Sequence, residues 1–175
     1  NEGTRNKTPE ELEEEIDLLG ASIRIGGGSE NITVSVNTLA RNFEKTLAIV
    51  EEMLLQPRWD ATAFELAKTR TLNSLRRSSI DPTYLGSNAL KNLIMGENNI
   101  YATDVSGTTE SVQAMTMDQL KAFYEKNLSP SISRFLVVGA VDQPRVEKAL
   151  ASLNANWAAK EVQMPEVLPA QTPEK

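Results

Sequence analysis

Apolar residues recur at spacings of three and four along most of the chain, a pattern typical of amphipathic helices. The first such segment begins with Thr8, Pro9 and Glu11, which combine a capping box with proline at the first helical position, and it ends at Gly20. The same reasoning predicts helices over residues 9–19, 42–55, 60–79, 82–95, 116–127 and 142–157, and a short helical turn over 109–114.

Three other stretches have the pattern of β-strands. Residues 21–27 and 30–39 alternate apolar and polar positions around a glycine-rich turn, which predicts an antiparallel hairpin. Residues 133–141 are almost continuously apolar, which predicts a central strand covered on both faces. The fold class is therefore α+β, with helices on one face of a largely antiparallel sheet. Because three strands are few for so many helices, we expect further strands from upstream of Asn1 or from a neighbouring chain.

The helical period also predicts which residues face a core. They are Leu12, Ile16 and Leu19; Phe43, Leu47, Val50 and Leu54; Phe64, Ala67, Thr71, Leu75 and Ser78; Leu85, Ala89, Leu90, Leu93 and Ile94; Leu120, Phe123 and Tyr124; and Val146, Ala149, Leu150, Leu153 and Trp157. Residues 158–175 lack the period and contain three prolines. We therefore interpret 1–157 as one domain and 158–175 as a proline-rich linker or tail.

Composition removes several classes of chemistry. The chain contains no cysteine and no histidine, so disulfides, thiol catalysis, a Ser-His-Asp triad and a histidine-rich metal site are excluded within these residues. A net charge of −6 argues against nucleic acid, because neutralising phosphates requires a basic surface. No run approaches the ~20 apolar residues of a membrane span. The acidic residues of 10–17 and the glycines of 26–28 are interpreted as a solvated face and a turn, not as metal or phosphate sites.

The helix predicted over residues 60–79 has no chemically distinctive residue on its core face. Asp60 is a fair N-cap. Ala67 and Ser74 are small and lie seven residues apart, on nearly the same line along the helix.

A series of short motifs runs from residue 2 to residue 157. They are Glu2-Gly3-Thr4, Leu19-Gly20-Ala21, Met53-Leu54 with Pro57-Arg58-Trp59, Asp81-Pro82, the loop after Gly96, Gly107-Thr108-Thr109-Glu110-Ser111-Val112, Phe123-Tyr124, Ser129-Pro130 and Val137-Val138-Gly139-Ala140-Val141-Asp142. In this order and spacing they resemble the first domain of the M16 (pitrilysin-type, insulinase-like) zinc metallopeptidases. The resemblance implies a LuxS/MPP-like metallohydrolase fold, without its first strands and helix.

The resemblance also implies positions for the zinc ligands. M16 peptidases use an inverted His-x-x-Glu-His motif, which would lie just upstream of Asn1, and a third ligand, a glutamate, on a later helix. Matching the pattern before Arg76-Arg77 places this ligand at Ser74, and a supporting glutamate at Ala67. A serine hydroxyl is a poor zinc ligand and alanine offers none. The nearest acid, Glu65, lies about half a turn around the helix from Ser74.

A later loop departs from the family as well, because it reads Asn99-Ile100-Tyr101 where the family often has His-Pro-Tyr. The resemblance therefore implies a non-catalytic domain that holds no cofactor. Such a domain would contribute chamber wall, substrate contacts and interface beside an active His-x-x-Glu-His domain. That partner, in the same chain or a second subunit, would hold the zinc and cleave a peptide in the shared chamber.

Two alternatives stay open. One is a structural or assembly subunit on the same fold, as in the core proteins of respiratory complex III. The other is an active zinc endopeptidase domain whose motif lies upstream and whose third ligand is a different acid. A homo-oligomer also fits. Bacterial relatives favour the periplasm or the cell envelope, and the cytoplasm remains open.

Overall fold

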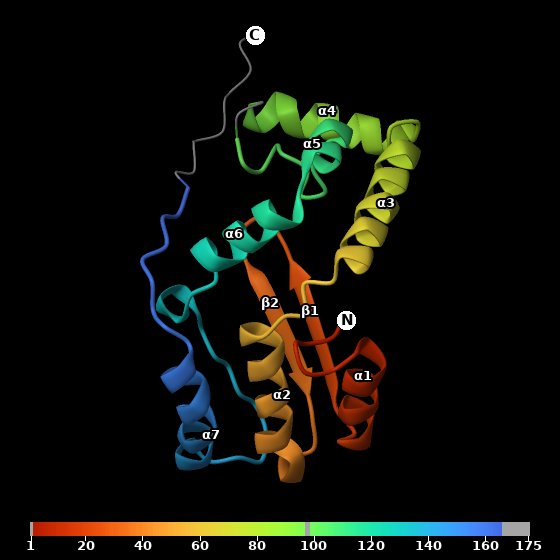
Figure 1. The fold of residues 1–175 in the computed structure, drawn as a ribbon. Coiled ribbons are helices and arrows are strands. Elements are labelled where there is room, and N and C mark those ends of the chain that lie inside the picture. Colours follow the sequence, from red (N-terminus) through yellow and green to blue (C-terminus); the bar gives the residue numbers. More distant parts are fainter. Residues whose placement is uncertain (1, 97–98, 166–175) are drawn as a thin grey trace. The chain divides into compact units, whose positions relative to one another are not determined.

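A computed structural model describes residues 2–96 and 99–165 (Figure 1). Its elements are α1 (Pro9–Leu18), β1 (Ser22–Gly27), β2 (Ile32–Asn37), the 3-10 turn η1 (Ala40–Asn42), α2 (Phe43–Leu55), α3 (Ala61–Ser78), α4 (Pro82–Met95), α5 (Thr109–Ala114), α6 (Met117–Asn127), the 3-10 turn η2 (Pro130–Ile132) and α7 (Gln143–Asn156). They belong to two compact units. The first contains α1, β1, β2, α2, most of α6 and α7, and the second contains α3, α4, α5 and the turn 28–31.

The predicted helix ends are confirmed where the sequence carries a cap. The Thr8 hydroxyl accepts from the Glu11 N–H at 3.2 Å, and the Glu11 carboxylate accepts from the Thr8 N–H at 2.8 Å. Gly20 follows α1 with φ +58°, a conformation that glycine adopts readily. The Asp81 carboxylate accepts from two N–H groups of the first turn of α4. Local polar groups therefore fix where these helices begin and end.

The predicted hairpin is also confirmed. Strands β1 and β2 pair antiparallel from Ser22 opposite Asn37 to Gly27 opposite Ile32. The Gly28 N–H donates to the Asn31 carbonyl at 2.8 Å and closes the turn. The register places Ile23 beside Val36 on one face of the sheet, as the alternation required.

The core of the first unit lies where α1, α2 and the hairpin meet. Leu12, Ile16 and Ile49 are buried there, and Ile23 and Met53 pack against them. Helix α7 packs on α2, with Leu153 of its predicted stripe buried. The helical period thus identified the inner faces of α1, α2 and α7 correctly.

Two predicted inner faces are wrong, and one residue of a third is misplaced. On α4, Ala89 is exposed and the large residues of the stripe are exposed by 44% to 62%: Leu85, Leu90, Leu93 and Ile94. On α6, Phe123 is 59% exposed and Leu120 38%. On α3, Ala67 is exposed. Periodicity identifies an apolar stripe but not the surface that covers it, and no described element covers the stripe of α4.

The strand predicted over residues 133–141 is not formed. Residues 131–140 are all exposed, and the described part of the chain contains no strand there. Figure 1 shows an irregular ribbon leading into α7 at this position. The physical reason is that a strand needs a neighbour to which its backbone can bond, and the described sheet consists of β1 and β2 alone.

Candidate functional site

Helix α3 carries the positions that the family resemblance singles out. Its covered stripe consists of Phe64, Lys68, Thr71, Leu75 and Ser78, with Leu75 only 9% exposed. The Lys68 ammonium donates to the Met115 carbonyl at 3.0 Å and lies 6.0 Å from the centre of the Phe64 ring. In this way α3 packs on α5 and the chain that follows it.

Ser74 and Ala67 lie beside that stripe, and both are exposed. With 100° between successive residues, they share one side of α3 with Arg70 and Arg77, which are also exposed. Glu65 is exposed on the opposite side of the helix. The side of α3 that holds the expected ligand positions therefore presents cations and a hydroxyl.

These residues do not fit a zinc ion. Zinc is bound by thiolate, imidazole or carboxylate groups, usually three or four of them. Across residues 2–96 and 99–165, no three side chains of histidine, cysteine, aspartate or glutamate come together. A cationic neighbourhood also disfavours a divalent cation.

The loop after α4 uses Asn99 for structure. Asn99 is 2% exposed, its side-chain oxygen accepts from the Tyr101 N–H at 3.0 Å, and its carbonyl accepts from the Ala102 N–H at 3.0 Å. The Tyr101 hydroxyl donates to the Glu30 carboxylate, and this bond raises the pKa of Tyr101. The residue that stands where the family often has histidine therefore helps to build a turn.

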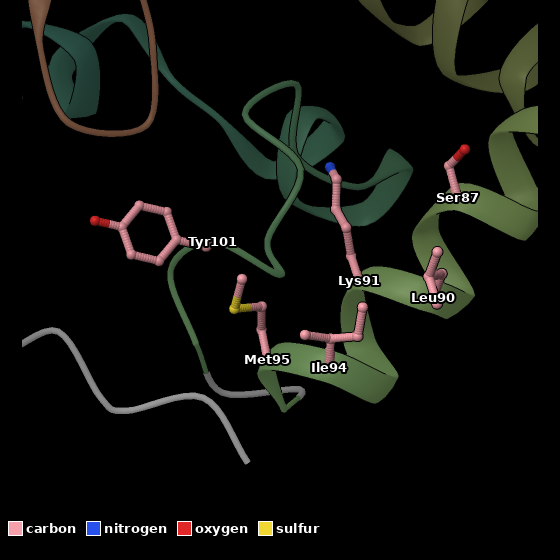
Figure 2. A pocket seen from close by; sticks show the side chains of 6 residues that line it. All are labelled: Ser87, Leu90, Lys91, Ile94, Met95 and Tyr101. Carbon is pink, nitrogen blue, oxygen red and sulfur yellow. The ribbon is translucent and has the colours of Figure 1, made fainter. Parts of the chain in front are cut away.

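A hollow of about 430 Å³ lies between the last turns of α4 and this loop (Figure 2). Its lining consists of Ser87, Leu90, Lys91, Ile94, Met95 and Tyr101. The walls are mainly apolar, and the Lys91 ammonium provides one positive charge. Sequence reasoning missed this hollow because it assigned Leu90 and Ile94 to a core.

Other residues of the family motifs prove to be scaffold. Thr4 is fully buried, forms an isolated bridge with Pro57, and its hydroxyl donates to the Glu52 carboxylate at 2.6 Å. The Lys7 ammonium bonds the same carboxylate at 2.6 Å. Burial raises the pKa of Glu52, but the hydrogen bonds from Lys7 and Thr4 outweigh it, and the net pKa is lowered. The Gly-Thr motif thus ties the start of the chain to the end of α2.

Two aromatic residues from other motifs of the series contact each other in the same unit. Trp59 and Tyr124 pack edge to face, with ring centres 5.3 Å apart and an angle of 83° between the planes. The Tyr124 hydroxyl donates to the Leu54 carbonyl, and burial raises the pKa of Tyr124. Trp59 adopts φ +55°, which is unusual for a large residue. These two aromatic residues link the segment after α2 to α6.

Comparison with known proteins gives consistent results. The family model described as "Peptidase M16 inactive domain" matches residues 114–175. An uncharacterized zinc protease of Mycobacterium leprae is 24% identical over 139 residues, which are 79% of this chain and 31% of that protein. This chain therefore spans about a third of that relative's length.

Solved structures agree with the fold. A peptidase M16 inactive domain from Pseudomonas fluorescens has a TM-score of 0.88 at 23% identity, and the match covers 99% of this chain and 42% of that one. The periplasmic protease PqqL from Escherichia coli has a TM-score of 0.77 at 18% identity, with 97% of this chain and 19% of that one covered.

In the described residues, no helix is both long and apolar enough to cross a bilayer. These comparisons agree with the resemblance read from the sequence motifs: residues 114–175 match the model of the peptidase M16 inactive domain, and the chain has the fold of the inactive domain from Pseudomonas fluorescens.

Proposed function

We propose that this chain is the non-catalytic domain of an M16 zinc metalloprotease, and that it forms chamber wall, substrate contacts and interface beside an active His-x-x-Glu-His domain. The observation that carries this proposal is the side of α3 with Ser74 and Ala67. It is exposed, and it offers two arginines where a zinc site would need carboxylates. The description of the matching family model as an inactive domain supports the same reading.

In this proposal the metal belongs entirely to the partner domain. The chain has no histidine to share a zinc ion. Elemental analysis of the assembly purified under native conditions should therefore give one zinc per His-x-x-Glu-His domain and none for this chain. An additional equivalent of zinc that disappears when this chain is removed would overturn the proposal in favour of an active domain.

Peptide cleavage tests the contribution of this chain to catalysis. The partner carrying His-x-x-Glu-His should cleave an unfolded peptide faster when this chain is present than when it is absent. The control replaces the partner's glutamate by glutamine, and this should abolish cleavage in both cases. Normal assembly without any change in cleavage would favour the structural-subunit alternative.

We also propose a compartment for this chain. PqqL is described as a periplasmic protease, which supports a periplasmic or envelope location for this chain. Cell fractionation with an antibody against this chain tests the proposal, and recovery in the cytoplasmic fraction alone would contradict it.

A further inference from the structure

One side of α3 carries hydrogen-bond donors and no carboxylate. With 100° between successive residues, Arg70, Asn73, Ser74 and Arg77 lie within a sector of about 100°, and all four are exposed. The single acid of α3, Glu65, lies outside this sector. We call the four residues the arginine face of α3.

The charge of this face differs from that of the chain as a whole. The chain has a net charge of −6, whereas residues 61–78 contain four cations and one acid. None of the ion pairs between described residues includes Arg70 or Arg77. Within residues 2–96 and 99–165, both guanidinium groups are therefore without a carboxylate partner and are available to a ligand from outside.

The chemistry of the face favours carboxylates. A guanidinium presents N–H donors in a planar fork that matches the two oxygens of a carboxylate. The Asn73 amide and the Ser74 hydroxyl add further donors. Arg70 and Arg77 are seven residues apart, which is about 10 Å along the helix axis.

An extended peptide supplies carboxylates at a similar spacing. Side chains at alternate positions of such a peptide lie on one side of it, about 7 Å apart. Arginine side chains are long and flexible, so Arg70 and Arg77 can bend towards each other over the remaining distance. A peptide with acidic residues at alternate positions therefore fits the arginine face.

The position of the face indicates that its ligand is the substrate. A zinc ligand of an active domain lies close to the bound peptide, because the metal polarises the carbonyl that is cleaved. Ser74 stands at the position matched to such a ligand, so the proposed function turns this side of α3 towards the peptide. A nucleic acid is disfavoured by the net charge of the chain.

We propose that Arg70 and Arg77 bind acidic side chains of an extended peptide substrate, with Asn73 and Ser74 as further donors. The face gives the protease a preference for peptides that carry aspartate or glutamate at alternate positions. The identity of the ligand as substrate rests on the proposed function, whereas the affinity for carboxylates rests on the residues of the face.

Peptide binding tests the preference without cleavage. The assembly is prepared with the glutamate of the partner's His-x-x-Glu-His motif replaced by glutamine. Two labelled unfolded peptides are compared by fluorescence anisotropy, one with glutamate at every second position and one with glutamine at the same positions. The glutamate peptide should bind about fivefold more tightly, because two exposed ion pairs contribute modestly. Equal affinities, or tighter binding of the glutamine peptide, would overturn the proposal.

Variants of this chain test whether the arginine face is the cause. Arg70→Gln and Arg77→Gln should each lower the preference for the glutamate peptide about twofold, and the double variant should abolish it. Arg76→Gln is the matched control, because it removes the same charge from an exposed position of the same helix outside the face. It should leave the preference unchanged. An equal effect of Arg76→Gln would overturn the proposal, since the charge of the helix and not the face would then be responsible.

Size-exclusion chromatography of the same variants tests a different ligand, an acidic surface of the partner. The double variant should assemble with the partner as the unmodified chain does. Loss of assembly in the double variant would overturn the proposal in favour of a contact between the two proteins.

Cleavage by the assembly with an intact partner separates this inference from the proposed function. Cleavage that depends on this chain but shows no preference for the glutamate peptide overturns the role of the arginine face and leaves the function standing. Arginine-dependent binding of the glutamate peptide in an assembly whose cleavage does not depend on this chain confirms the face and overturns the function.

Discussion

At the scale of single residues, the motifs that reveal the family serve mainly as scaffold. Gly3 has φ +82°, and Thr4 beside it is buried and bonded to Glu52. A Cβ on Gly3 would lie 2.6 Å from the Lys7 carbonyl oxygen, and backbone atoms cannot move aside cheaply. Glycine is therefore required there for both conformation and space.

Replacement of Gly3 by alanine should consequently destabilise the first unit. We expect Gly3→Ala to lower the free energy of unfolding by more than about 1 kcal/mol, because a left-handed alanine and a steric clash add together. Gly26→Ala is the control from the same unit, since its Cβ would meet nothing within 4 Å. Urea unfolding followed by circular dichroism measures both variants, and an equal effect of the two would refute this account.

Ser74→Glu tests the assignment of the degenerate ligand position. Ser74 is exposed, so the variant should change the free energy of unfolding by less than about 0.5 kcal/mol. It should bind no zinc, because a single carboxylate without histidine does not hold the metal. Calorimetric titration with zinc checks this, and Ser74→Gln is the uncharged control. Tight stoichiometric zinc binding by Ser74→Glu alone would contradict the assignment.

At the scale of elements, helices far apart in the sequence are joined by charge as well as by packing. The Arg145 guanidinium at the start of α7 bonds the Glu44 carboxylate of α2 at 2.5 Å and 2.7 Å, and it also donates to the Ala40 carbonyl. The bond from Arg145 lowers the pKa of Glu44 from its usual 4.5 to about 2. This contact fixes the N-terminal end of α7 beside that of α2.

The ion pair makes a pH-dependent contribution to stability. The folded pKa is below the unfolded one, so the contribution is complete above about pH 4.5 and is lost as the pH falls towards about 2. The melting temperature should fall as the pH is lowered through this window, and this decline should be smaller in Arg145→Gln. Arg134→Gln, an exposed arginine outside the described ion pairs, should leave the decline unchanged. If plots of melting temperature against pH are parallel for Arg145→Gln and the unmodified protein, the ion pair is excluded as a source of this pH dependence.

Elements were predictable from the sequence where the deciding interactions are local. The caps at Thr8 and Asp81 and the glycine-rich turn lie within a few residues of the structures that they fix, so both helices and the hairpin were predicted. The outcomes for the strand over residues 133–141 and for the inner face of α4 were not predictable, because both depend on contacts that the local pattern does not encode. An apolar pattern shows that a segment needs covering, and it cannot show what covers it.

At the scale of the whole molecule, the chain consists of two compact units. The first has its core between α1, α2 and the hairpin, and in the second α3 packs on α5. Each unit therefore responds first to changes in its own packing.

Leu75→Ala tests this independence. Leu75 is buried in α3, and its truncation should cost about 2–4 kcal/mol. The rate of amide hydrogen exchange should rise in α3 and α5 and stay unchanged in α2 and α7. Leu66→Ala, at a position of the same helix that is 49% exposed, should have little effect in either unit. An equal rise in α2 would show that the two units unfold together.

The candidate site was predictable only as a departure from a pattern. Ser74 and Ala67 carry no signal of their own, and they became informative when the motifs around them resembled a family that has carboxylates there. Their exposure could not be deduced from the resemblance, because it depends on how α3 packs, whereas their arginine neighbours follow from the helical period alone. The hollow beside Tyr101 had no sequence signal, since its apolar lining looks like a core stripe.

The exposed segment 134–140, where the predicted strand is not formed, also has a consequence for how cells handle this protein. An unpaired apolar edge is a template for association with any other chain that is incompletely folded. A copy in which this segment is uncovered is therefore expected to be retained by chaperones or degraded by proteases.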